Sequence, residues 1–183
     1  MSIRRVVTGH DAAGKAVVLI DGAARNVKLR QASGGLVSTL VWATDETPAG
    51  VSEHADRAER EMGVAPPRNG SAFRIVDFPP TGDAAAIDNA AVIREMGIGG
   101  QGGDHAGAAA RHPLMHRTRS IDYAVVIAGE IDMLLDDSEV HLNAGDVLVQ
   151  QGTHHAWVNR GTQTCRVAFV LIDAEEPAQL RRT

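Results

Sequence analysis

Short β-prone runs separated by turn-forming clusters repeat through the second half of the chain and limit what it can fold into. The runs cover residues 123–127, 130–135, 139–142, 147–151, 155–158 and 164–172. Clusters rich in Gly, Asn, Asp and Ser, which favour tight turns, stand between most of them. Short strands at spacings of about ten residues predict an antiparallel β-sandwich or barrel.

The first half has the same character with a weaker pattern. Residues 4–8, 15–20, 36–43, 71–78 and 91–96 are predicted strands, and residues 26–30 form a weaker one. Residues 51–63 are charged, with a thin apolar face, and are expected to form a short exposed helix or an ordered loop. The predicted fold class is therefore all-β with at most short helices.

Composition and charge exclude several classes of partner. The net charge is −5 and only 3% of the residues are aromatic, which disfavours nucleic-acid binding. No window approaches the ~18 consecutive apolar residues of a membrane-spanning helix, and the N-terminus lacks the apolar stretch of a signal peptide. A single cysteine, Cys165, excludes an intramolecular disulfide and fits a reducing compartment. We expect a cytoplasmic protein without membrane or nucleic-acid partners.

A glycine-rich segment at residues 97–104 is not a phosphate-binding loop. It lacks the Gly-Lys-Ser/Thr of a Walker loop and the strand-to-helix context of a dinucleotide-binding turn. We expect a flexible loop near the mouth of the barrel.

Two stretches carry the histidines and turn glycines that point to a family. The first runs from His116 through Asp122 to Gly129, and the second runs from Gly145 through Gly152 and His155 to Asn159. They resemble the paired motifs of the cupin superfamily, whose first motif reads His-x-His, three or four residues, Glu, six residues, Gly. The second reads Gly, five residues, Pro-x-Gly, two residues, His, three residues, Asn.

The resemblance extends to residues 4–11 and 41–45, which are similar to those of small single-domain cupins of bacteria and of fungal secondary-metabolite pathways. It implies an antiparallel jelly-roll β-barrel in one structural domain. Residues 1–111 are expected to extend the barrel with extra strands, residues 112–173 to carry the core motifs, and residues 174–183 to form a tail. Cupins are frequently dimeric, and exposed sheet edges favour pairing, so we expect a homodimer.

The departures from the family pattern leave a reduced ligand set. Thr118 stands at the place of the second histidine and Asp122 at that of the glutamate. The resemblance then implies His116, Asp122 and His155 as metal ligands. Two imidazoles and one carboxylate suit one divalent transition metal such as Fe, Mn, Ni or Zn. A metal-free polar pocket and a purely structural hydrogen-bonded network are the alternatives.

Strand periodicity independently groups some of these residues. Alternate residues of a strand face the same side, so His116 lies with Thr118 and His155 lies with Trp157. We expect Thr118, Trp157 and, at the rim, His112 to contact substrate.

Other residues are expected to stay outside the pocket. Tyr123 has the opposite parity to Asp122, and Arg117 and Arg119 alternate away from the ligand face. His141 and His154 are likewise expected to point outward. Arg94 could meet a substrate carboxylate only if the run at 91–96 joins the barrel as a strand.

Two functions fit this pocket. The first is an enzyme acting on a small oxygenated organic compound, of the oxygenase, dehydratase, decarboxylase or isomerase type, with Asp122 and His155 as catalytic residues. The alternative is a non-catalytic small-molecule-binding cupin.

Overall fold

The computed structural model describes residues 2–51, 55–98 and 110–180, and eleven strands are the main regular elements of this part of the chain. The elements are β1 Arg4–His10, β2 Ala16–Ala23, β3 Val27–Arg30, β4 Leu36–Thr44, β5 Ser71–Phe78, η1 Ala84–Ala86, α1 Asn89–Met96, β6 Ser120–Ala128, β7 Glu130–Leu134, β8 Glu139–Asn143, β9 Val147–Gln151, β10 Ala156–Val158, β11 Cys165–Asp173 and η2 Ala178–Leu180. The all-β prediction is confirmed.

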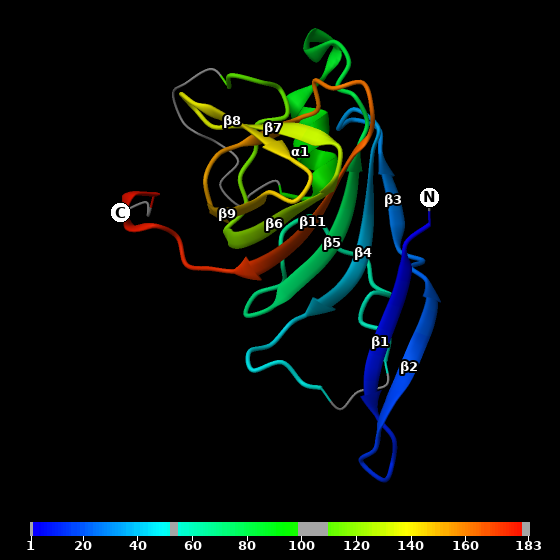
Figure 1. Cartoon of the computed structure of the whole chain (residues 1–183). Helices are drawn as coiled ribbons and strands as arrows, with labels where there is room; N and C mark the ends of the chain where they lie inside the picture. The colour runs from blue at the N-terminus through cyan, green and yellow to red at the C-terminus, as the bar shows by residue number, and fades with distance from the viewer. Residues whose placement is uncertain (1, 52–54, 99–109, 181–183) are drawn as a thin grey trace.

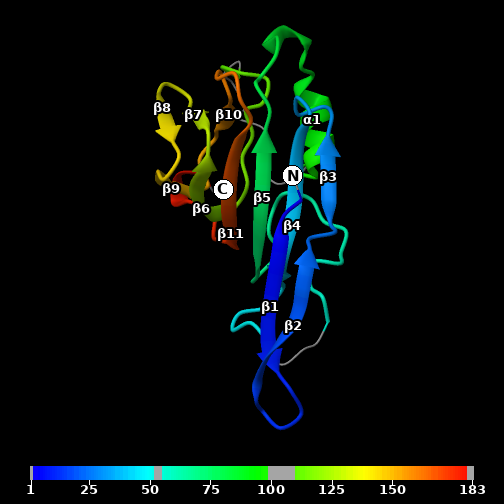
Figure 2. The same cartoon turned by 45° about the vertical axis from the view of Figure 1, so that its right-hand side comes forward.

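A six-stranded antiparallel sheet forms the larger layer. Its strand order is β3-β4-β5-β11-β6-β9, and most of these strands lie side by side in Figure 2. Three strands from the first half of the chain thus join strands that carry the two sequence motifs, through the pairing of β5 with β11.

A three-stranded sheet, β10-β7-β8, packs over part of this layer (Figure 1). Alternating inward residues of both sheets form the core, as expected for a jelly-roll sandwich. An aromatic cluster fills its centre: the ring of Trp157 stacks edge-on to Phe169 at 5.2 Å between centroids and lies 6.3 Å from Phe78. This core forms one wall of the pocket described below.

The run at residues 91–96 is a helix, so the prediction of a strand there is wrong. Asp88 caps the first turn by accepting a hydrogen bond from the Ala90 N–H, and Gly97 ends the helix in a left-handed conformation. Val92 and Met96, one turn apart, are buried within a second cluster of hydrophobic side chains, separate from the core between the two sheets. Residues 55–63 contain no helix. In the part of the chain that the structure describes, no helix has the length and apolarity to span a bilayer.

The first two strands form a separate hairpin. β1 pairs only with β2, and the hairpin projects away from the rest of the molecule in Figure 1. Arg5 anchors it, because its guanidinium is buried and binds the Asp56 carboxylate and the Val41 carbonyl.

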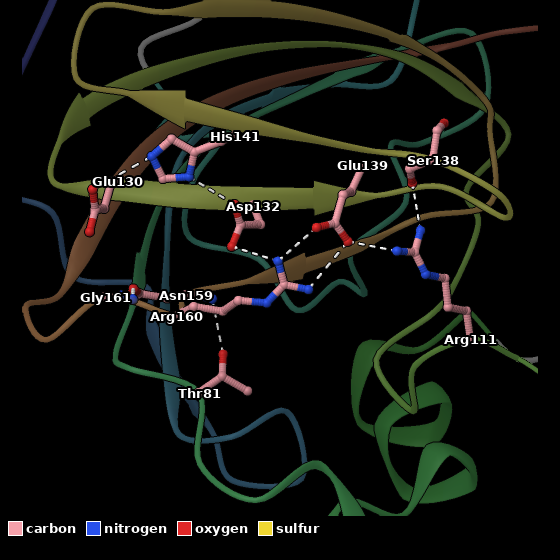
Figure 3. Close-up of polar contacts among 10 residues, drawn as sticks. All are labelled: Thr81, Arg111, Glu130, Asp132, Ser138, Glu139, His141, Asn159, Arg160 and Gly161. Carbon is pink, nitrogen blue, oxygen red and sulfur yellow. Dashed lines mark hydrogen bonds and ion pairs between the residues drawn. The ribbon is translucent and has the colours of Figure 1, made fainter.

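Asn159, the last residue of the second sequence motif, joins three segments. Its side-chain amide donates to the Phe78 and Gln163 carbonyls at 2.9 and 2.8 Å, and its side-chain oxygen accepts from the Gly161 N–H. The Asn159 backbone N–H also donates to the Thr81 hydroxyl (Figure 3). Asn159 therefore ties the end of β5 to the turn between β10 and β11.

The surface beside Asn159 is held by an ion-pair network. Arg160 binds Asp132 of β7 and Glu139 of β8, and Arg111 binds the same Glu139 from the segment that leads into the first motif (Figure 3). The network fixes one side of the smaller sheet, outside the pocket.

Replacing Asn159 by Ala should lower the free energy of unfolding by about 2–3 kcal/mol, because several buried polar groups lose their partner at once. Urea denaturation measures it. Thr162→Ala, an exposed change in the same turn, should shift stability by less than about 0.5 kcal/mol. Equal effects of the two substitutions would contradict this role.

Candidate functional site

A pocket opens on the inner face of the six-stranded sheet and collects the predicted site residues. Val76, Phe78, Phe169 and Leu171 give it an apolar wall, while His116, Thr118, Asp122, His155 and Trp157 bring the polar groups and the indole. Asp122 comes from β6, and His116 and His155 face each other across an isolated backbone bridge. The sequence motifs therefore meet in one cavity.

Asp122 is a buried carboxylate without a cationic partner among the described residues. Only 5% of its surface is exposed. The Ser120 hydroxyl donates to Oδ1 at 2.6 Å, and the Thr118 hydroxyl lies 2.8 Å from Ser120 Oγ. Burial raises the pKa of Asp122 to about 6, and the Ser120 hydrogen bond opposes this only in part. Its proton can therefore exchange near neutral pH.

The two histidines are neutral. Their rings lie 4.4 Å apart between centroids. Burial lowers the pKa of His116, and burial together with His116 lowers the pKa of His155 well below the ordinary value. Nδ1 of His116 lies 2.8 Å from the Leu114 carbonyl, and Nδ1 of His155 lies 2.9 Å from the Thr153 carbonyl. With Nδ1–H donating to these carbonyls, Nε2 of each ring keeps its lone pair.

Gln150 connects the carboxylate to one imidazole. It is the cross-strand partner of Asp122 on β9, and its amide nitrogen lies 3.5 Å from Asp122 Oδ2. The same nitrogen lies 2.7 Å from Nδ1 and 3.1 Å from Nε2 of His155. Gln150 Oε1 is buried and has no hydrogen-bond partner in the described structure. The sequence gives no signal of this role for Gln150, which is one of two adjacent glutamines before Gly152.

The chemistry of the donor set suits a metal, whereas its arrangement does not. Two neutral imidazoles with Nδ1 held by carbonyls are typical of metal ligands. Within residues 2–51, 55–98 and 110–180, however, no three His, Cys, Asp or Glu side chains converge as a metal site. The Gln150 amide lies between Asp122 and His155, and Ser120 binds the carboxylate. The assignment of His116, Asp122 and His155 as ligands stays a prediction.

The other residues that we expected to contact substrate lie in different places relative to the pocket. Thr118 and Trp157 line the pocket, and their contact with substrate stays a prediction. His112 is half-buried outside the lining, with Nδ1 accepting from the Leu114 N–H at 3.2 Å. Its contact with substrate stays a prediction. The loop expected at residues 97–104 lies largely outside the described residues.

The residues that we expected to lie outside the pocket differ in their exposure. Tyr123 is 47% exposed and His141 is exposed, as expected. Arg117 is buried and donates to the Gly152 carbonyl, so the expectation that it is solvated is wrong. His154 is buried beside Asp136, although it stays off the pocket lining. Arg94 lies exposed on α1 rather than on a barrel strand.

Comparison with known proteins assigns the family. Residues 104–172 match the family described as Cupin domain. Phomopsin biosynthesis cluster protein C′ of Diaporthe leptostromiformis is 33% identical, over 93% of this chain and 78% of its own. The cupin-domain-containing oxidoreductase fogC of Aspergillus ruber is 30% identical, over 94% of this chain and 73% of its own. The chain belongs to the cupin family.

Solved structures of similar shape are more distant. A putative ethanolamine utilization protein Q of Salmonella typhimurium has a TM-score of 0.46 at 9% identity, covering 96% of this cupin and 99% of that chain. A Cupin 2 conserved barrel domain protein of Salinispora arenicola has a TM-score of 0.42 at 14% identity, covering 81% and 82%.

The raised pKa of Asp122 should appear in the stability of this cupin. Folding disfavours the ionised form, so stability should fall as pH rises from the ordinary carboxyl pKa of 3.8 through about 6. Two pKa units correspond to about 3 kcal/mol. Relative to Asp122→Asn, the wild type should lose about that amount between pH 4 and pH 7 in urea denaturation with chelator present.

Asp137→Asn, at an exposed position, is the control and should leave the pH profile unchanged. A constant stability difference between wild type and Asp122→Asn across this range would contradict the buried, uncompensated carboxylate.

Proposed function

We propose that this cupin is an enzyme that converts a small oxygenated organic compound in the pocket, with Asp122 and His155 as catalytic residues. One observation carries the proposal: a buried carboxylate and two neutral imidazoles meet at one end of a largely apolar cavity. Such a cavity excludes water from a bound substrate while presenting groups that accept and return protons.

The names of the relatives support a role in small-molecule metabolism. Three are described as cupin-domain-containing oxidoreductases at 29–30% identity, and two belong to a phomopsin biosynthesis cluster. We infer a small-molecule-processing cupin of secondary metabolism, without assigning the relatives' substrates to it.

The contacts suggest a separate catalytic or positioning role for each residue. Asp122, as carboxylate, removes a proton from a carbon next to a substrate carbonyl, and the resulting carboxylic acid returns that proton at another atom. Thr118 and Ser120 orient the carboxylate through a continuous hydrogen-bonded chain. The neutral His155 ring, contacted by Gln150, accepts a hydrogen bond from a substrate hydroxyl through the Nε2 lone pair. This chemistry serves isomerisation or dehydration.

To hold a divalent metal, the side chains of His116, Asp122 and His155 would have to converge on it in place of their present contacts with Ser120 and Gln150. When bound, it would supply Lewis-acid or oxygen chemistry. The proton-transfer roles above belong to the side chains themselves.

The alternative is a cupin that binds its ligand without converting it. The hydrogen bonds from Ser120 and Gln150 to Asp122 favour it, because they satisfy the carboxylate in a fixed polar network. Turnover separates the two functions.

Turnover should appear when the protein is incubated with a panel of small aromatic and aliphatic keto and hydroxy acids and analysed by mass spectrometry. Parallel samples contain chelator, Fe(II), Mn(II), Ni(II) or Zn(II). Asp122→Asn should lower kcat by about 100-fold or more, because it removes the proton acceptor. Tyr123→Phe, an exposed neighbour on the same strand, should retain wild-type kcat.

Compounds that stabilise the protein but yield no product under any of these conditions would support the non-catalytic alternative. Elemental analysis of protein purified without a metal-affinity tag tests the ligand set. Failure to take up any of the four metals would contradict it.

We also propose that this cupin is a cytoplasmic homodimer. Tyr123, Val125 and Ile127 of β6 and Val147 and Val149 of β9 form an exposed apolar face at the edge of the six-stranded sheet. β9 is an edge strand whose free side can pair with the same strand of a second copy. Burial raises the pKa of the Cys165 thiol to about 11, which suits an inert thiol in a reducing compartment.

Light scattering coupled to size-exclusion chromatography should give twice the mass of the 19.4 kDa chain. Val149→Lys should shift the protein toward monomer, because it places a charge in the apolar face. Val18→Lys, an equally exposed position on the β1–β2 hairpin, is the control. A monomeric wild type would contradict the dimer.

A further inference from the structure

Two buried arginines line the same pocket, on strands that lie on the other side of β11 from the Asp122 strand. Arg30 ends β3 and Arg74 lies in the middle of β5, and both line the pocket. Their exposed fractions are 7% and 4%. Arginine is rarely buried to this extent without an anionic partner.

Neither guanidinium has such a partner among the residues that the structure describes. Arg30 donates to the Glu95 carbonyl and Arg74 to the Gly63 carbonyl. The Glu95 carboxylate is occupied elsewhere, by the Ser33 hydroxyl and the backbone N–H groups of Ala32 and Ser33. Two backbone carbonyls are thus the hydrogen-bond acceptors seen for these two charges.

Several donor atoms remain buried without an acceptor among the described residues. They are Nε and Nη2 of Arg30 and Nε of Arg74. A buried donor without a partner is costly, and an unpaired buried charge is more so. Burial and the like charge of Arg30 lower the pKa of Arg74 to about 10, so the charge persists at neutral pH. An anion entering the pocket would relieve both costs.

The unpaired edge of Arg30 has the shape of a carboxylate receptor. Nε and Nη2 form one side of the guanidinium, which presents two parallel N–H groups. The same edge of Arg4 holds both oxygens of Asp21 at 2.8 Å. The same edge of Arg166 holds both oxygens of Asp77 at 2.6 and 2.7 Å. In Arg30, which lines the pocket, no described residue binds this edge.

We propose that Arg30 and Arg74 bind the carboxylate of the substrate, and that the substrate is therefore a small organic acid. This inference deepens the proposed function and rests on the same pocket.

The sheet register places this carboxylate away from the reacting end. Arg74 is the cross-strand neighbour of Phe169, and Asp122 is the neighbour of Leu171, so β11 lies between them. Two strand spacings amount to about 10 Å. Phe169, Phe78 and Trp157 also line this pocket. The carboxylate consequently serves as an anchor, and the bond that changes lies at the far end of the acid.

The test compares the binding of carboxylates with that of their neutral amides by isothermal titration and thermal shift. The probes are benzoate, phenylacetate and cinnamate, each with its primary amide, and inorganic phosphate. At least one carboxylate should raise Tm and bind at least tenfold more tightly than its amide. Arg30→Gln and Arg74→Gln should each abolish this preference.

Two further variants separate anion recognition from folding. Arg30→Lys keeps the charge but loses the two-pronged edge, and it should weaken the carboxylate about fivefold or more. Arg4→Gln removes the same edge from a surface ion pair and should bind like wild type. If the glutamine variants do not fold, the carboxylate-to-amide ratio of wild type and Arg30→Lys still decides the result.

Equal affinities for carboxylates and amides, or wild-type preference in Arg30→Lys and Arg30→Gln, would overturn this inference. Phosphate binding tighter than every carboxylate would also overturn it. Asp122→Asn should bind the carboxylate like wild type while losing turnover. Absence of turnover with intact carboxylate preference would therefore count against the enzyme proposal alone.

Discussion

The burial of charged and polar side chains inside an apolar sandwich is the constraint on which the rest of this structure depends. Asp122, Arg30 and Arg74 are each more than nine-tenths buried, and two histidines lie between the same layers. Such groups are stable in an interior only when their hydrogen bonds are satisfied or when their charge is lowered. The histidines are uncharged and hydrogen-bonded, Asp122 is only partly satisfied by its hydrogen bonds, and the arginines are the least satisfied.

Because the hydrogen bonds of these buried groups are satisfied to different degrees, the two ends of the pocket differ. At one end, Ser120 and Gln150 contact Asp122, and backbone carbonyls hold the rings of His116 and His155. At the other end, arginine donors have no acceptor in the part of the chain that the structure describes. Cross-strand register fixes the separation, because β11 lies between β5 and β6. In the proposed function, a ligand that spans the pocket is selected by its anionic group at one end and converted at the other.

Much of the fold could be predicted from sequence because turn chemistry and strand alternation are local. Gly129 shows this: it takes a positive φ in the turn between β6 and β7, where an added Cβ would lie 3.0 Å from Cys165 Cα. The strand predicted at residues 91–96 failed because only caps at Asp88 and Gly97, together with packing partners far along the chain, make it a helix.

Only the site residues that belong to the two sequence motifs could be predicted from the sequence. His116, Asp122, His155, Thr118 and Trp157 follow a recognisable spacing and do line one pocket. Arg30 and Arg74 follow none, and a charged residue in a strand is normally assigned to the solvent face. Their inward orientation depends on the pairing of β3, β4 and β5 with β11, which no local pattern reveals. The role of Gln150 likewise depends on its pairing with Asp122.

A crystal structure with a bound arylcarboxylate probe, collected with anomalous data at metal absorption edges, tests the central claim most directly. The account predicts the carboxylate on the Nε–Nη2 edge of Arg30 and near Arg74, with the ring along Phe169 and Trp157 toward Asp122. A carboxylate bound at His116 and His155 instead, with both arginines still unpaired, would contradict it.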